Sequence, residues 1–232
     1  MTNSIFITAT GTDIGKTYVS GLLVKYLRQN NINCGYYKPV LSGACENIDG
    51  SLYLGDAEFV VDKSGLCCDA STCVSYSFNE PLSPHLASSR QGVKILSEKI
   101  LNDYNNLSAQ YEFLVVEGAG GITCPFSLEE DYSLLLSDIM CDIAAPIIIV
   151  ADAGLGTINS TLLTVEYAKN KGLEVLGIIL NNYDQNNFMH IDNKLQIEKL
   201  TNSKVIATVG YNSENIDIDR VVLDRVLRAV EV

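Results

Sequence analysis

The stretch "SIFITATGTDIGKTYVS", residues 4–20, joins a short apolar run to a turn of small and polar residues. Its second half approaches the phosphate-binding pattern GxxxxGK[ST], in which a strand leads through a glycine-containing turn into a helix. Gly15, Lys16 and Thr17 match the end of the pattern, but Thr10 stands where its first glycine is expected. The backbone N–H groups of such a turn and the positive end of the helix dipole favour an anion. The stretch therefore predicts a triphosphate site, and a strand-to-helix turn with an incidental GKT is the alternative.

Helical spacing of apolar residues begins directly after this turn, at Val19, Leu22, Leu23, Tyr26 and Leu27. Farther along, short apolar runs alternate with amphipathic segments, which is typical of βα units and a mostly parallel sheet. We expect strands at 4–9, 33–39, 112–118, 145–153, 173–181 and 203–209. We expect further helices near 94–109, 157–171, 190–201 and 216–230, and an irregular segment at 40–84. The predicted fold class is α/β: a single domain over residues 1–232, with a mostly parallel central sheet flanked by helices on both faces, as in P-loop NTPases.

The amino-acid composition of the chain limits the kinds of molecule that it is expected to bind. The formal charge is −12 and the pI is about 4.5, which disfavours nucleic acid because a phosphate backbone binds clustered Lys and Arg. The chain has no apolar run of about 18 residues, so we predict no membrane partner and a cytoplasmic location. The seven cysteines form no CxxC pair, which argues against a disulfide framework. The cluster "CCDASTC", residues 67–73, is either a metal site or a loop of reduced thiols; we expect thiols because its spacing matches no zinc module.

Charged residues follow two of the expected strands at the point where each strand ends. Lys38 lies in "YYKPVLSG" and Glu117 in "VEGAGG", while Asp56 in "GDAEF" is a weaker candidate. Because the carboxyl ends of parallel strands meet at one edge of the sheet, Lys38 and Glu117 would face the same crevice as Lys16. A carboxylate there can hold Mg²⁺ beside the phosphates. Solvated surface side chains are the alternative for both residues.

Seven motifs occur in a fixed order: "TGTDIGKT", "YYKPVLSG", "GDA", "EPLSPH", "VVEGAGG", "GLGTIN" and "GIILNN". Together they resemble the dethiobiotin synthetase family over residues 4–182. The resemblance implies a ligase that depends on ATP and Mg²⁺ and closes a cyclic urea on 7,8-diaminononanoate. It would take carbon from CO₂ or bicarbonate, proceed through a carbamate and a mixed anhydride with phosphate, and act as a homodimer.

The resemblance also implies a role for each matching residue. Catalysis would fall to Lys16, Lys38 and Asp13, although Asp13 matches a position that is Glu in some relatives. The nucleotide would contact Asp13, Ile14, Gly15, Lys16, Thr17, Tyr18, Glu117 and Asn181. The Mg²⁺ ligands would be Thr17, Asp56 and Glu117. The substrate would contact Thr12, Lys38, Ser42, Ser83, Pro84 and Gly118, and its carboxylate would meet Gly156, Thr157, Ile158 and Asn159 across the dimer interface.

The chain departs from the family pattern at two positions. Ala9 matches the early glycine of the family, which some members lack, and Gly210 stands where relatives usually carry a proline in the segment that contacts the base. The second departure leaves selectivity among nucleoside triphosphates open. Two other functions also stay open: a partner-dependent switch ATPase of the partitioning type, which would carry a signature lysine at the position of Gly11, and a related amide-forming ligase on the same fold.

Overall fold

The computed structural model describes residues 3–46 and 52–218, and its centre is a seven-stranded sheet. Each strand runs parallel to its neighbours. In spatial order the strands are β11 (Val205–Thr208), β10 (Val175–Asn181), β9 (Ile147–Asp152), β1 (Asn3–Ala9), β6 (Phe113–Glu117), β2 (Cys34–Ser42) and β5 (Val74–Phe78). Because all the strands point the same way, their carboxyl ends line one edge, where ligands of open α/β sheets collect.

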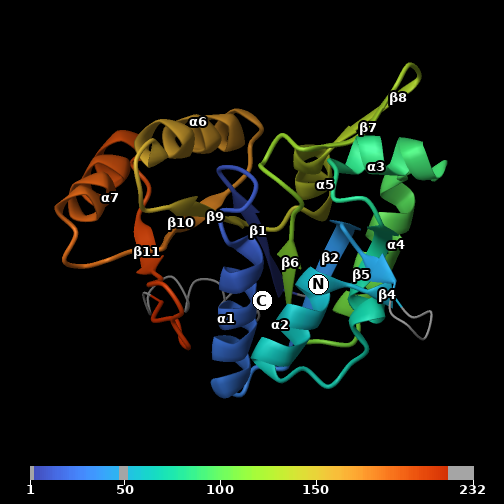
Figure 1. Cartoon of the computed structure of the whole chain (residues 1–232), viewed down its shortest axis with the longest axis horizontal. Coiled ribbons are helices and arrows are strands. Elements are labelled where there is room, and N and C mark those ends of the chain that lie inside the picture. Colours follow the sequence, from blue (N-terminus) through green and yellow to red (C-terminus); the bar gives the residue numbers. More distant parts are fainter. Residues whose placement is uncertain (1–2, 47–51, 219–232) are drawn as a thin grey trace.

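Helices cover both faces of this sheet (Figure 1). One face carries α1 (Lys16–Gln29) and α2 (Gly55–Ser64), which pack against each other. The other face carries α3 (Pro84–Gln91), α4 (Ser97–Ser108), α5 (Leu136–Ile143), α6 (Thr157–Asn170) and α7 (Phe188–Thr201). The two apolar cores lie between these layers, and strands such as β6, which is buried at every position, contribute to both. The predicted α/β fold class is confirmed.

All six expected strands are present, with ends within three residues of the prediction. The helix after the phosphate turn and the helices expected near 94–109, 157–171 and 190–201 are confirmed as α1, α4, α6 and α7. Of the helix expected at 216–230, residues 216–218 are not helical and 219–230 lie outside the described part of the chain.

The expectation of an irregular segment at 40–84 was wrong. This segment contains α2, a short 3₁₀-helix η1 (Ala70–Cys73) and the edge strand β5. Two small hairpins, β3 (Cys45–Glu46) with β4 (Leu52–Tyr53) and β7 (Pro125–Glu129) with β8 (Tyr132–Leu135), complete the described elements. Helix α2 was missed because its apolar face is short and lies among acidic residues, so packing against α1 rather than a strong helical pattern determines it.

The alternation of side chains along β2 determines which residues reach the phosphate loop. Tyr36 and Lys38 point to the face covered by α1 and α2, while Tyr37 belongs to the core on the opposite face. Tyr36 is paired in register with Val115 of β6, so Glu117, two residues after Val115, lies on the same face as Tyr36 and Lys38. Among the described residues, no helix has the length and apolar character needed to cross a bilayer.

Candidate active site

The phosphate loop connects β1 to α1 and obtains its shape from two residues with left-handed backbone. Asp13 has a φ of +59° and Gly15 a φ of +91°, whereas Ala9 is buried and ends β1 as ordinary strand. The early glycine of the family pattern, whose position Ala9 occupies, is therefore not needed in this loop. Gly15 is needed for a second reason: a Cβ there would lie 2.1 Å from Nδ2 of Asn181. The side chain at the end of β10 thus packs directly against the loop.

Asn181 also holds the loop by a hydrogen bond. Its Nδ2 donates to the carbonyl oxygen of Ile14 at 2.9 Å, and only 5% of the residue is exposed. Lys16 starts α1, and its Nζ donates to the carbonyl of Gly11 at 3.2 Å across the loop. The lysine is 7% exposed, and burial lowers its pKa, an effect that the charge of Glu117 offsets in part. A buried lysine folded over such a loop is suited to phosphate oxygens.

A cluster of charged groups lies beside the loop, around the ammonium group of Lys38. Lys38 Nζ donates to Glu117 Oε1 at 2.7 Å and to Asp56 Oδ2. Thr17 Oγ1 donates to the same Glu117 oxygen at 2.7 Å. Glu117 has no exposed surface and Lys38 only 4%. The middle of β2, the end of β6, the start of α1 and the first turn of α2 therefore bring four predicted site residues to one point. Lys38 was expected at the end of its strand, but β2 continues to Ser42, so Lys38 reaches the site from the interior of the strand.

Burial alone would lower the pKa of Lys38, but the negative charges of Glu117 and Asp56 outweigh it, so that the pKa of Lys38 is raised. The pKa of Asp56 is lowered, because the positive charge of Lys38 outweighs the effect of its burial. At neutral pH the pair is an ammonium with a carboxylate. This buried pairing argues against the alternative that Lys38 and Glu117 are solvated surface residues.

Tyr36 is a site residue that the sequence analysis missed. Its hydroxyl donates to Glu117 Oε2 at 2.9 Å, and the residue is 1% exposed. Burial, followed by the charge of Glu117, raises the pKa of Tyr36 well above its usual value, so that the phenol stays protonated and donates. The period of two along β2 places Tyr36 beside Lys38 and was the signal that could have identified it.

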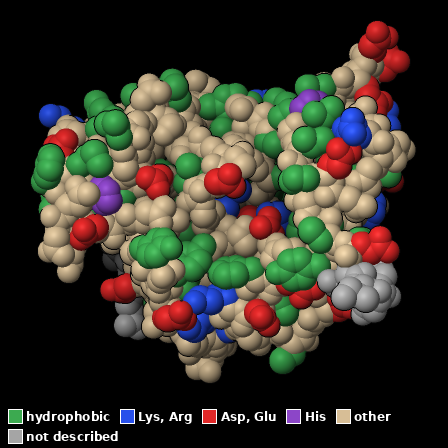
Figure 2. Space-filling model, viewed as in Figure 1, with side chains coloured by type: hydrophobic (Ala, Val, Ile, Leu, Met, Phe, Trp, Pro, Cys, Tyr) green, Lys and Arg blue, Asp and Glu red, His purple; other side chains and the backbone are tan. Residues whose placement is uncertain are grey.

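The loop and the charged cluster open into a cavity of about 620 Å³. Figure 2 shows a hollow in the middle of this face with acidic and basic side chains gathered in it. The predicted residues that line the cavity are Thr12, Asp13, Gly15, Lys16, Thr17, Lys38, Ser42, Asp56, Ser83 and Pro84. The hydroxyl of Ser42 is buried there and has no hydrogen-bond partner within the described part of the chain. The remaining lining residues, which the sequence analysis did not identify, are Val40, Pro81, Leu82, Ala119, Gly120 and Cys124.

Several predicted site residues lie apart from this cavity. The hydroxyl of Tyr18 donates to the carbonyl of Ser213, and the backbone N–H of Gly118 donates to Ile7 at 2.9 Å. Gly156, Thr157, Ile158 and Asn159 form the start of α6, where Gly156 has a φ of +90°. A single chain does not bring the start of α6 to the cavity wall.

Comparisons with known proteins place the chain among nucleotide-dependent enzymes. The profile of a family described as AAA domain (AAA_26) matches residues 3–217. The chain is 47% identical over 218 residues to the ATP-dependent dethiobiotin synthetase BioD of Clostridium botulinum strain Alaska E43 (Type E3), covering 94% of this chain and 95% of that protein. It is 50% identical over 194 residues to the protein of the same name from strain Langeland, covering 84% and 85% of the two chains.

A solved structure shares the fold. A ParA family ATPase from Chlorobium tepidum TLS superimposes with a TM-score of 0.56 at 14% identity, covering 97% of this chain and 98% of that one. Identity this low shows a common fold and says nothing of the activity.

Proposed function

This chain belongs to the ATP-dependent dethiobiotin synthetase family, and from that premise we propose that its cavity closes a cyclic urea on 7,8-diaminononanoate. It is an ATP-dependent ligase. CO₂, or bicarbonate as its source, supplies the carbon, and ATP is converted to ADP and phosphate. The observation that carries the proposal is the Lys38 cluster, in which an ammonium group, two carboxylates and the phosphate loop meet at one cavity.

The phosphate loop holds the nucleotide in this proposal. The N–H groups around Gly15 and the start of α1 face the phosphates, and Lys16 adds a positive charge. Ile14 takes part through its backbone, which Asn181 restrains. Asn181 has a second N–H and a carbonyl oxygen with which to bind the adenine base.

Thr17, Asp56 and Glu117 suit Mg²⁺, because all three offer the hard oxygen donors that this ion prefers. Both carboxylates contact one ammonium and the hydroxyl contacts Glu117, so the three side chains converge. Three protein oxygen donors would leave room for phosphate oxygens and water around the ion. When bound with the nucleotide, Mg²⁺ neutralises charge on the phosphates.

Lys38 and Ser42 act on the carbamate. A substrate amine attacks CO₂ and loses a proton, and the resulting carbamate carries a negative charge that the Lys38 ammonium neutralises. The unpartnered Ser42 hydroxyl donates a hydrogen bond to the carbamate. A carbamate oxygen then attacks the γ-phosphorus, releasing ADP, and the second amine attacks the carbonyl carbon, releasing phosphate. Lys16, Lys38 and Asp13 surround the reacting atoms, and Thr12, Ser83 and Pro84 line the substrate side of the cavity.

A second copy of the chain completes the substrate site. Apolar side chains are exposed over α6 and α7 and the turn before α6, on the upper left of Figure 2. They include Leu155, 94% exposed, and Phe188, 85% exposed. An apolar surface of this kind indicates a protein interface. The N–H groups of Gly156, Thr157, Ile158 and Asn159 would then bind the substrate carboxylate at the partner's cavity. The active unit is a homodimer of single-domain chains, 1–232, in the cytoplasm.

The proposal for Lys38 is tested by separating binding from turnover. Lys38→Ala should lower dethiobiotin formation by about 10²-fold or more, the scale for losing a charge-stabilising donor, and leave ATP affinity within a factor of about three. Lys94→Ala is the matched control, because Lys94 pairs with Glu129 on the surface. Equal turnover in the two variants would remove Lys38 from the mechanism.

A further inference from the structure

The segment between α2 and β5 contains three cysteines, none of which takes part in the proposed reaction. Cys67 and Cys68 precede η1, and Cys73 ends it. The sulfur atoms of Cys68 and Cys73 lie 3.7 Å apart. That separation is van der Waals contact, so a small shift of one side chain brings the two sulfurs to bonding distance.

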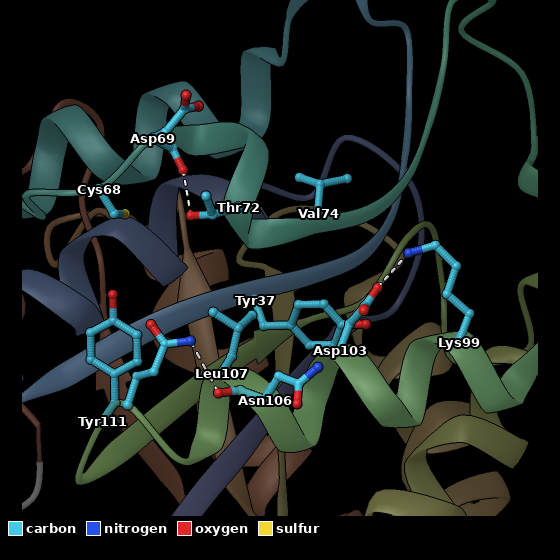
Figure 3. A pocket seen from close by; sticks show the side chains of 11 residues that line it. Tyr37, Cys68, Asp69, Thr72, Val74, Lys99, Asp103, Asn106, Leu107 and Tyr111 are labelled. Carbon is cyan, nitrogen blue, oxygen red and sulfur yellow. Dashed lines mark hydrogen bonds and ion pairs between the residues drawn. The ribbon is translucent and has the colours of Figure 1, made fainter.

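The three thiols differ in access. Cys73 is 2% exposed, Cys68 is half-buried and Cys67 is exposed. Cys68 lines a cavity of about 550 Å³ between η1 and α4. Figure 3 shows Cys68 and Tyr111 at one end of this cavity, and Asp103 with Lys99 at the other. A small reagent can therefore reach Cys68 through the cavity, whereas the buried Cys73 is shielded from a dissolved reagent and contacts the Cys68 sulfur.

We propose that Cys68 and Cys73 form a dithiol that a hydroperoxide converts into an intramolecular disulfide. The Cys68 thiolate attacks one oxygen of hydrogen peroxide, breaks the O–O bond and becomes a sulfenic acid, with release of one water. The Cys73 sulfur then attacks the Cys68 sulfur, and the hydroxyl of the sulfenic acid leaves as a second water with the proton from Cys73. In total, two thiols lose two electrons and two protons, and the peroxide is reduced to two waters.

The order of these steps follows from the surroundings of each sulfur. Burial raises the pKa of the Cys73 thiol to about 12, so this thiol does not react first with a dissolved oxidant. Once Cys68 is a sulfenic acid, Cys73 can attack it despite its high pKa, because the two sulfurs are already in contact.

The bond would form next to the strand that carries Lys38. Cys73 directly precedes Val74, and Val74 is the partner of Lys38 in the pairing of β2 with β5. Cys73 belongs to the same apolar core as Tyr36, whose phenol donates to Glu117. The dithiol therefore lies behind the charged cluster, on the same face of the sheet.

Peptide mass spectrometry of the full chain tests the proposal. Trypsin leaves all three thiols in one peptide, 64–90, because no Lys or Arg lies between Lys63 and Arg90. After peroxide treatment of the native protein, denaturation and alkylation with iodoacetamide, the wild-type peptide should lose two hydrogens and carry one label instead of three.

Two variants identify the partners. Cys67→Ser should still close the bond and carry no label, whereas Cys68→Ser should keep two labels; Cys68→Ala repeats the test if the serine variant does not fold. Three labels on the wild-type peptide after peroxide would overturn the proposal. A bridge that persists in Cys68→Ser would also overturn it, because Cys67 would then be the partner. The mass measurement does not depend on the ligase activity. A negative result for the disulfide would therefore leave the proposed ligase reaction untouched, and the reverse also holds.

Discussion

Replacing Tyr36 with phenylalanine removes one oxygen atom and keeps the ring that packs in the core. The lost hydroxyl is the donor to Glu117 Oε2, at 2.9 Å and without contact with solvent. A hydrogen bond to a charged group contributes about 1.5–3 kcal/mol. Tyr36→Phe should therefore lower the free energy of unfolding by about that amount, measured by urea denaturation without Mg²⁺.

The more specific effect concerns the metal. Thr17 and Lys38 both donate to Oε1 of Glu117. Within the described part of the site, Oε2 accepts its hydrogen bond from Tyr36, which therefore fixes the position of this oxygen. If the free energy of the lost hydrogen bond is expressed in metal binding, about 1.5–3 kcal/mol corresponds to an affinity for Mg²⁺ that is about 10–160-fold weaker. The Mg²⁺ concentration at half-maximal turnover should rise by about that factor, and calorimetry with a non-hydrolysable ATP analogue should show the same change.

Tyr37→Phe is the matched control. Tyr37 is equally buried, and its hydroxyl contacts Ser75 Oγ at 2.6 Å and the carbonyl of Ile100 at 2.9 Å, on the opposite face of the sheet from Glu117. This variant should lose a similar stability, about 1–3 kcal/mol, with an unchanged Mg²⁺ requirement. An unchanged requirement in Tyr36→Phe, or an equal shift in both variants, would refute the argument.

Three further predictions concern the metal, the loop and the interface. Glu117→Gln keeps an oxygen but removes the charge, so Mg²⁺ titration of turnover should shift by about tenfold or more; an identical titration would reject Glu117 as a ligand. Asn181→Ala removes the bond to the Ile14 carbonyl, worth about 1 kcal/mol, so ATP affinity measured by calorimetry should fall about fivefold. Leu155→Asp should convert the dimer into monomers in sedimentation, whereas Leu128→Asp, on the β7–β8 hairpin, should not; wild-type protein that sediments as a monomer would contradict the dimer.

The central strands and the phosphate turn could be predicted from the sequence because local signals determine them. The strands are apolar runs long enough to be recognised, and the GKT turn carries its own pattern. The edge strand β5, "VSYSF", was missed because polar residues interrupt it and pairing with β2 fixes it instead. Its position depends on contacts far apart in the sequence, which a local pattern does not contain.

In the candidate site, too, the residues within local motifs could be predicted and the contacts between distant segments could not. Lys16, Thr17, Lys38 and Glu117 were identified from motifs that end strands or start helices, and the structure brings them together. The packing of Asn181 against Gly15 could not be anticipated, because it joins β10 to a loop far from it in the sequence. The start of α6 lies away from the cavity in one chain, so its predicted role depends on a second copy.

A turnover measurement with 7,8-diaminononanoate, ¹³C-bicarbonate, Mg²⁺ and ATP, with CTP and GTP as parallel donors, tests the proposed reaction most directly. Dethiobiotin should form in equal amount to ADP, with the label in the ureido carbon, and ADP should not accumulate when the diamine is omitted. Steady release of ADP without labelled dethiobiotin, from folded protein that binds ATP, would contradict the proposed reaction.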